Sequence, residues 1–211
     1  MTSERVYGGR SAQQRRADRH AQLLAAGRER FADDGWTGAT VAGICRTAGL
    51  SPRYFYEHVA DRESLFLAVV EDIAHEVEQV VKEAAATEGA DPVERARLVL
   101  EAVAAYFSAD PRAIRVALIE SLATPAFQLR RRDLLARFSD LATRLMAALR
   151  DRDDPGPGTL PSTAGMLLTG GLVEMLIAWA TDDAATSRQA GTPPDEAVHH
   201  LVVLAAAVAR L

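Results

Sequence analysis

Apolar residues recur at helical spacing along almost the whole 211-residue chain, and no segment shows the sustained alternation of apolar and polar residues that is typical of a strand. The sharpest instance is the segment 40–65, in which two short helical patterns are separated by Ala48-Gly49-Leu50-Ser51. Thr40 is suited to cap the first pattern, and Pro52 opens the second at a position where its missing N–H costs nothing. The segment predicts two short helices joined by a tight turn.

The same spacing predicts an all-α chain of about nine helices. A polar, proline-containing loop at 151–158 precedes two final helices, at about 159–181 and 194–211. We expect an N-terminal three-helix domain at residues 1–60, with a basic arm at 1–18, and a larger helical domain at 61–211. The predicted inner face of the helix after Asp91-Pro92 is Leu98, Val99, Ala102, Tyr106 and Phe107, and one further helix is expected through Ile114, Leu118 and Ile119.

Two short helices with a glycine-containing turn form the helix-turn-helix unit, whose second helix fits the major groove of B-DNA. The net charge of −5 conceals an asymmetry that favours this reading. Residues 1–58 hold nine arginines against six acidic residues, a net charge of +3, whereas residues 59–211 carry −8. This difference in charge between the two parts of the chain is modest, but it favours contact with phosphates at the N-terminal end.

Several other classes of protein receive little support. The polar, basic N-terminus lacks the apolar core of a secretory signal, so we expect a cytoplasmic protein. The apolar run 165–180 is interrupted by Glu174 and is short for a bilayer span, which argues against a membrane partner. The single cysteine, Cys45, excludes an intrachain disulfide and is expected to be a buried, inert thiol. The scattered histidines predict no metal site, and we expect no cofactor.

Six short motifs lie between about Arg19 and Leu65. They are Phe31-Ala32-x-x-Gly35-Trp36, Thr40-Val41, Ile44-Cys45, Ala48-Gly49-Leu50-Ser51, Phe55-Tyr56-x-His58-Val59 and Asp61-Arg62-Glu63-x-Leu65. With these motifs the chain resembles the TetR family of one-component transcriptional regulators. Beyond Leu65 only the number and length of the helices agree.

The resemblance implies roles for individual residues of this segment. Thr40 would hold a backbone phosphate, Tyr56 and His58 would reach phosphates, and Arg62, where the family usually has lysine, would clamp another. Phe55 would face the core of the small bundle. Arg53, Tyr54 and Val59 depart from the family's usual residues, so no base preference can be transferred from a relative.

Physical chemistry independently supports a reading role for Arg53, because a guanidinium can form a bidentate contact with guanine O6 and N7. Tyr54 is suited to a thymine methyl group or a phosphate. Arginines of the basic arm, including Arg15 and Arg16, are suited to the minor groove. The predicted DNA-binding residues are Thr40, Arg46, Ser51, Pro52, Arg53, Tyr54, Tyr56, His58 and Arg62.

In the TetR family the helical body surrounds an effector cavity, so the resemblance implies a small-molecule effector, largely apolar in character. Six candidate residues lie on or near predicted inward faces, although ordinary core or surface placement is an alternative for each. They are Tyr106, Phe107, Arg115, Glu120, Met146 and Glu174.

The last two helices are too apolar to form a free surface, and in the family they pair with their copies as a four-helix bundle. A homodimer on a palindromic operator in double-stranded DNA is therefore expected, with Gly165, Gly170 and Gly171 allowing close helix approach. The predicted interface is Met166, Gly170, Val173, Ile177, Leu201, Leu204, Ala205 and Val208.

The leading hypothesis is a ligand-relieved repressor. One alternative is a transcriptional activator without a small-molecule effector, and another is an all-helical module that docks an acidic protein. An enzyme is a weaker hypothesis, because no Ser/His/Asp, Cys/His, paired-carboxylate or phosphate-loop arrangement is present in the sequence.

Overall fold

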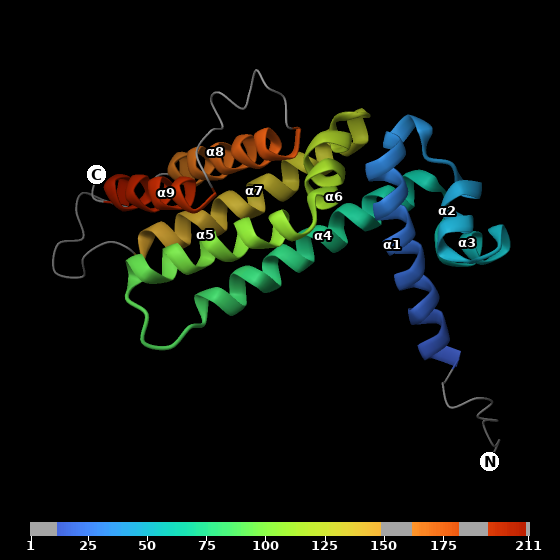
Figure 1. Cartoon of the computed structure of the whole chain (residues 1–211), viewed down its shortest axis with the longest axis horizontal. Coiled ribbons are helices and arrows are strands. Elements are labelled where there is room, and N and C mark those ends of the chain that lie inside the picture. Colours follow the sequence, from blue (N-terminus) through green and yellow to red (C-terminus); the bar gives the residue numbers. More distant parts are fainter. Residues whose placement is uncertain (1–11, 149–161, 182–193, 210–211) are drawn as a thin grey trace, which may run out of the picture. The chain divides into compact units, whose positions relative to one another are not determined.

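The computed structural model describes residues 12–148, 162–181 and 194–209, and within these ranges its regular structure is entirely helical (Figure 1). The predicted all-α class and the number of α-helices are confirmed for the described part of the chain. The α-helices are α1 (Ala12–Gly38), α2 (Val41–Ala48), α3 (Pro52–His58), α4 (Arg62–Ala85), α5 (Pro92–Ala109), α6 (Pro111–Ile114), α7 (Pro125–Ala147), α8 (Ser162–Thr181) and α9 (Pro194–Ala209).

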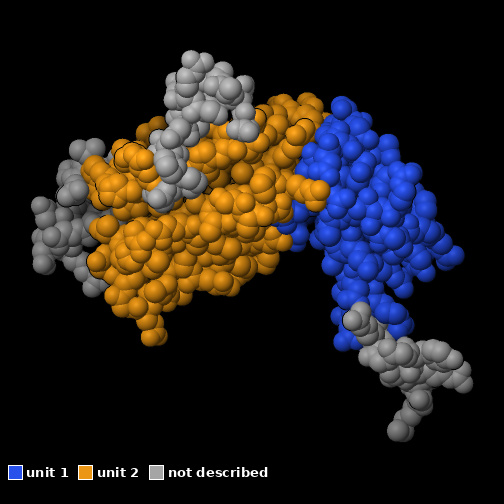
Figure 2. Space-filling model, in the orientation of Figure 1, with its two compact units in different colours: residues 1–72 blue, residues 73–211 orange. Residues whose placement is uncertain are grey.

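The chain divides into two compact units, residues 1–72 and residues 73–211, which Figure 2 colours separately. This boundary between compact units falls inside α4, whereas the division into functional domains at residue 60 stays a prediction. The physical reason is that the first turns of α4 belong to the core of the N-terminal unit. Phe66 meets Phe31 of α1, and Leu65 and Val69 lie close to Gly27.

An aromatic cluster forms the centre of the N-terminal unit. The ring centroids of Phe31, Trp36 and Phe66 lie 5.1–5.9 Å apart, and Phe66 meets the other two edge to face. Such pairs add about 0.5–1.5 kcal/mol beyond the area that they bury. Gly35 makes the cluster possible, because its φ of 70° interrupts α1 and lets the chain turn at Trp36.

The start of α1 corrects the prediction of a basic arm over residues 1–18. Residues 12–18 are the first turns of α1, in which Arg15 and Arg16 are exposed. Arg5 and Arg10 lie outside the described residues. The described part of the predicted arm is therefore a helical extension.

Helices α5, α7, α8 and α9 lie side by side in the C-terminal unit (Figure 1). Two apolar clusters hold them together: α5 contributes Leu100 and Ala104, which pack with Val198, Leu201 and Val202 of α9, while Met146, Ala164 and Ala205 join α7, α8 and α9. The buried face of α5 is rotated relative to the predicted one, because Leu98, Ala102 and Tyr106 are only half-buried. Its buried residues are Ala96, Val99, Leu100, Val103, Ala104 and Phe107.

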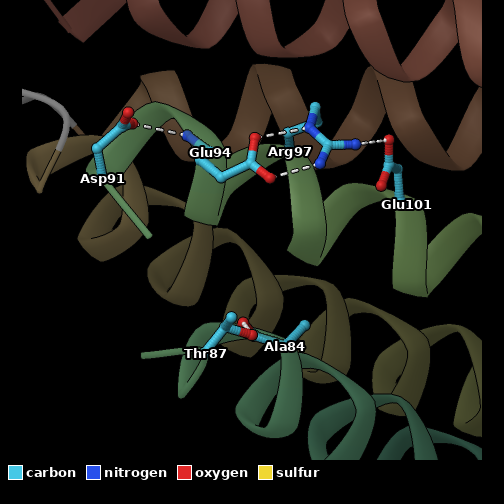
Figure 3. Close-up of polar contacts among 6 residues, drawn as sticks. All are labelled: Ala84, Thr87, Asp91, Glu94, Arg97 and Glu101. Atoms are coloured by element: carbon cyan, nitrogen blue, oxygen red, sulfur yellow. Dashed lines mark hydrogen bonds and ion pairs between the residues drawn. The ribbon is translucent and has the colours of Figure 1, made fainter. Parts of the chain in front are cut away.

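Side chains define the end of α4 and the start of α5 (Figure 3). The Thr87 hydroxyl donates to the Ala84 carbonyl, and the Asp91 carboxylate accepts from the Glu94 N–H at 2.9 Å. Further along α5, the Arg97 guanidinium bridges Glu94 on the preceding turn and Glu101 on the following turn. Its hydrogen bond lowers the pKa of Glu94. These contacts stabilise the last turn of α4 and the first turns of α5.

The helix predicted through Ile114, Leu118 and Ile119 is broken into three conformations. Helix α6 ends at Ile114, a π-helical segment occupies Arg115–Ile119, and a 3-10 turn follows at Glu120–Leu122. The Glu120 N–H donates to the Arg115 carbonyl, five residues back, and the buried Ser121 hydroxyl donates to the Ala117 carbonyl. A serine that competes for backbone carbonyls in this way is a known source of irregular helix.

Helix α8 is 20 residues long and, by length and composition, is apolar enough to cross a membrane. The helix is longer than the apolar run 165–180, because it begins at Ser162. Its contacts suit a packed helix of a bundle equally well. Val173 and Leu176 are buried within the chain, and Leu168 and Leu172 pack against the cluster shared by α5 and α9.

Gly165 allows α7 and α8 to approach closely within one chain. A methyl group at this position would collide with the Ser139 carbonyl oxygen and the Thr143 hydroxyl, both on α7. At Gly170 and Gly171, by contrast, a methyl group would meet nothing. Of the three glycines predicted to permit close helix approach, Gly165 therefore acts inside the chain.

The substitution Gly165→Ala should lower the free energy of unfolding by about 1–3 kcal/mol, because the α7 backbone has to move to admit the methyl group. Urea unfolding followed by Trp179 fluorescence in a Trp36→Phe background measures the effect in the C-terminal unit. The matched control is Thr163→Ala, an exposed position of the same helix, which should change stability by less than about 0.5 kcal/mol. Equal midpoints for the two variants would contradict this account of Gly165.

Candidate nucleic-acid interface

The turn between α2 and α3 is built by local contacts that the sequence predicted in part. The Thr40 hydroxyl accepts from the Gly43 N–H at 3.1 Å, which confirms Thr40 as the cap of α2. Gly49 adopts φ 67°, so its N–H reaches the Arg46 carbonyl while the Leu50 N–H reaches the Cys45 carbonyl. This pair of bonds is the Schellman ending of a helix, and it favours glycine for steric reasons.

Helix α3 has seven residues, and Phe55 is the one that is buried. Pro52 occupies its first turn, as predicted, but the Ser51 side chain makes no capping hydrogen bond. The Ser51 carbonyl instead accepts from the N–H groups of Tyr54 and Phe55. Phe55 faces the core, so the other side of α3 is left open to solvent.

The open side of α3 carries Arg53, Tyr54 and Tyr56. The Arg53 side chain is 85% exposed and Tyr56 is 60% exposed. Tyr54 is exposed to a smaller degree because the Arg19 guanidinium of α1 lies over its ring, 4.4 Å from the centroid. Such a contact is worth about 0.5–1 kcal/mol at an exposed site. The helix therefore presents a basic and aromatic surface that no described part of its own unit covers.

Arg53 also has a partner on its own helix. Its Nε donates to Glu57 Oε1 at 2.9 Å, one turn further along α3. Neither Glu57 nor Arg19 is among the DNA-binding residues that the sequence predicts. The four-residue spacing of Arg53 and Glu57 could have indicated the first contact. The contact of Arg19 with Tyr54 depends on how α1 packs against α3 and has no local signal.

His58 does not match the phosphate contact that the resemblance implied. Its Nδ1 lies 2.8 Å from the Tyr54 carbonyl oxygen, which can only accept, so Nδ1 is the donor. Nε2 is buried, and the ring stacks against His20 of α1 at 6.5 Å. The imidazole thus secures the last turn of α3 against α1 instead of pointing outward.

Arg62 has an internal role that was not predicted. Its guanidinium carbon lies 4.1 Å from the Trp36 ring centroid, and Nη1 donates to the Ala39 carbonyl. These contacts join the start of α4 to the end of α1 and to the residue before Thr40. The phosphate contact of Arg62 stays a prediction. The residue is already half-buried within its own chain.

The remaining predicted DNA-binding residues are exposed. Thr40 uses an oxygen lone pair in its cap, which leaves its hydroxyl proton available to an outside acceptor. Arg46 lies in the last turn of α2, and Ser51 and Pro52 lie where α3 begins. Burial raises the pKa of the Cys45 thiol, in keeping with an inert side chain.

The residues predicted to surround an effector do not form one inward-facing set. Arg115 and Glu174 are exposed, which corrects their assignment to inner faces, because the π-helical segment and the outer side of α8 direct them to solvent. Arg115 Nε lies 3.9 Å from Glu120 Oε1. Met146 is buried in the cluster shared by α7, α8 and α9.

Tyr106 and Phe107 are two members of that set that contact each other. Their rings meet edge to face at 5.0 Å, and Phe107 is buried. The half-buried Tyr106 hydroxyl donates to Glu76 of α4. A carboxylate and a phenol therefore lie together where α4 and α5 meet. No group of three or more His, Cys, Asp or Glu is placed to hold a metal ion in the ranges that the structure describes.

The residues predicted for a dimer interface differ in their exposure within the single chain. Met166, Gly170 and Leu204 are exposed, whereas Val173, Leu201 and Ala205 are buried in their own chain and Ile177 is half-buried. The reason is that α8 and α9 first cover α5 and α7. The side chain of Val208 lies outside the described residues. The exposed apolar residues of these two helices are Met166, Leu167, Val203 and Leu204.

A helix-turn-helix with an open second helix, carried by a helical body, defines the class of DNA-binding regulators. Residues 23–69 match the model of the bacterial regulatory proteins of the tetR family. The N-terminal segment of the chain therefore matches this family, in the region where its motifs lie.

Curated relatives match in the same region. The chain is 37% identical over 65 residues to the HTH-type transcriptional repressor AcnR of Corynebacterium diphtheriae, and 37% identical over 73 residues to AcnR of Corynebacterium jeikeium. These matches cover 31% and 35% of this chain. They span only 34% and 36% of the relatives, about a third of each.

Solved structures match over most of the chain. A TetR-like transcriptional regulator from Rhodococcus sp. RHA1 has a TM-score of 0.65 and 21% identity, over 89% of this chain and 93% of that one. The regulator FadR from Bacillus subtilis, in complex with stearoyl-CoA, has a TM-score of 0.72 and 15% identity, over 89% of this chain and 97% of that one. At these identities the likeness concerns the fold alone.

Replacing Arg62 by alanine should destabilise the N-terminal unit by about 1–3 kcal/mol, because both a cation–π contact and a hydrogen bond to a carbonyl are lost. Thermal unfolding followed by Trp36 fluorescence, in a Trp179→Phe background, measures the change. The control is Arg46→Ala, an exposed arginine of α2, which should leave the transition in place. An unchanged transition for Arg62→Ala would leave phosphate binding as its role.

Proposed function

We propose that this protein is a sequence-specific, DNA-binding transcriptional regulator that acts as a homodimer on a palindromic operator. The observation that carries the proposal is the open face of α3, where Arg53, Tyr54 and Tyr56 are exposed on a helix anchored by Phe55. A single helix of this kind fits the major groove of B-DNA. No enzymatic role is proposed.

Each exposed residue of α3 suits a different part of the duplex. Arg53 matches the O6 and N7 acceptors of guanine, and Tyr54 suits a thymine methyl group or a phosphate. Tyr56, together with the hydroxyls of Thr40 and Ser51 and with Arg46, suits phosphate oxygens, which set the register without reading sequence. We propose residues 1–60 as the DNA-binding domain and residues 61–211 as the effector-binding and dimerisation domain.

The apolar surface of α8 and α9 supports the homodimer. Leu167 is 75% exposed in the single chain, and Met166, Val203 and Leu204 are each more than half exposed. Large apolar side chains that are exposed together typically mark a protein interface. Gly170 and Gly171 lie open on the same helix, so a second copy can approach its backbone. A twofold pair would present two copies of α3 to two half-sites.

A small-molecule effector, largely apolar, is proposed to relieve DNA binding. FadR from Bacillus subtilis, a structural neighbour, was solved in complex with stearoyl-CoA. In this chain the rings of Tyr106 and Phe107 contact each other and the Tyr106 hydroxyl donates to the Glu76 carboxylate, and we propose these residues as part of the effector site. Because α4 contributes residues to both compact units, a ligand that favours one position of α4 can change the affinity for DNA.

Repression is proposed over activation because the curated relatives with matching N-terminal segments are named repressors. Access to chromosomal DNA implies a cytoplasmic protein. An activator that has no effector is the second candidate. The third, an interaction module for acidic proteins, differs in requiring no sequence preference for DNA.

Selection from a pool of random duplexes tests DNA recognition directly. The wild-type protein should enrich a palindrome, bind it with nanomolar-range affinity and lose affinity steeply as salt rises, because cations are released from phosphates. Arg53→Ala should weaken binding to the selected duplex by about 5–150-fold, the equivalent of one bidentate base contact. Arg132→Ala, which removes an exposed charge from α7, is the control and should bind like the wild type. A pool without consensus would exclude a sequence-specific regulator.

Dimerisation is tested by placing a charge in the exposed apolar surface of α8. Leu167→Glu should convert the dimer to a monomer, because a desolvated carboxylate without a partner costs several kcal/mol. Light scattering coupled to size exclusion reports the mass. Leu129→Glu is the matched control, since Leu129 is an exposed leucine of α7 and should leave the dimer intact. A wild-type protein that is monomeric throughout would refute the proposed assembly.

A further inference from the structure

We infer that Glu57 is a specificity-determining residue of the DNA-binding surface, acting by orienting Arg53 and by penalising contact with the wrong sequence. The inference rests on the proposed function and deepens it. It gives a role to a carboxylate that lies on the surface where a polyanion is expected to bind.

The position of Glu57 is costly both for helix α3 and for binding to phosphates. Between residues 35 and 60 it is the only acidic residue in the sequence. It is the second-last residue of α3, at the negative end of the helix dipole, where a carboxylate is unfavourable. The order of arginine before glutamate is also the weaker arrangement for a pair four residues apart. Stabilisation of the helix therefore does not explain Glu57.

The geometry of the ion pair offers an explanation. Glu57 Oε1 accepts from Arg53 Nε at 2.9 Å, so the contact uses the side edge of the guanidinium. Nη1 and Nη2 remain at the far end, and these two nitrogens supply the paired donors that guanine O6 and N7 require. The Glu57 contact holds the fork in one orientation, and less side-chain freedom is then lost when DNA binds.

The charge of Glu57 has a second consequence. The Arg53 side chain is 85% exposed and that of Glu57 is 42% exposed, so both are accessible to a partner of α3. Near any duplex the carboxylate is repelled by the phosphates, and this cost applies to every sequence. Only a site with a guanine for Arg53, or with a cytosine amine for the carboxylate itself, offsets the cost. Glu57 thus weakens binding in general and weakens it least at the correct site.

The substitution Glu57→Gln tests this inference because it keeps the shape of the side chain and removes its charge. Fluorescence anisotropy at one salt concentration would measure binding of the full-length protein to the selected palindrome and to an unrelated duplex. Glu57→Gln should bind the unrelated duplex about 3–10-fold more tightly while changing affinity for the palindrome less than about 3-fold. The ratio between the two affinities should therefore fall.

Two further variants separate specificity from charge and from folding. Glu83→Gln removes an exposed carboxylate of α4 and should leave the ratio unchanged. In an Arg53→Ala background, Glu57→Gln should reduce the ratio by a smaller factor than in the wild type, because its partner is missing. The circular dichroism transition should match that of the wild type, since the side chain is exposed.

The inference would be overturned if Glu57→Gln raised the affinity for both duplexes equally, so that the ratio of the two affinities did not change. It would also be overturned if the ratio fell by the same factor with and without Arg53. A wild-type protein that prefers no sequence would instead refute the proposed function. The two failures are distinguishable because the wild-type ratio is measured before any variant is compared.

Discussion

The packing of one aromatic ring determines where the candidate reading surface lies. A seven-residue helix is too short to be stable alone in water, and Phe55 is the residue of α3 that is buried. The left-handed backbone at Gly49 sets the direction in which the chain enters α3, and His58 secures its last turn through the Tyr54 carbonyl. Because α3 has so few attachments, every role proposed for its exposed face depends on that buried ring.

Three arginines of the N-terminal unit share a common arrangement, in which the planar guanidinium contacts another side chain of the same chain. Arg19 lies over Tyr54, Arg62 lies over Trp36, and Arg53 is paired with Glu57. A lysine could supply the charge but could neither stack as a plane nor keep a free edge while another edge is bound. The surface is thus organised before a partner binds, and this limits the entropy that binding has to offset.

Features that depend on residues within four positions were predictable from the sequence. The cap at Thr40, the turn at Gly49 and the proline at the start of α3 are of this kind, and the structure has all three. The directions of His58 and Arg62 were not predictable, because they depend on His20 and Trp36 in a different helix or turn. A resemblance transfers a position in the chain, but the contacts that orient a side chain belong to the individual fold.

The two last helices illustrate a different limit. Helix α8 is apolar on nearly all sides, so its sequence contains no stripe that distinguishes an inner face from an outer one. The sequence therefore predicts Val173 and Leu201 in a subunit contact, although both pack inside the chain. It does not distinguish the more exposed Leu167. A helix of this composition has to bury both halves of its circumference. One half is covered by α5, α7 and α9 of the same chain, and the remaining half is the surface on which we propose that an identical copy packs.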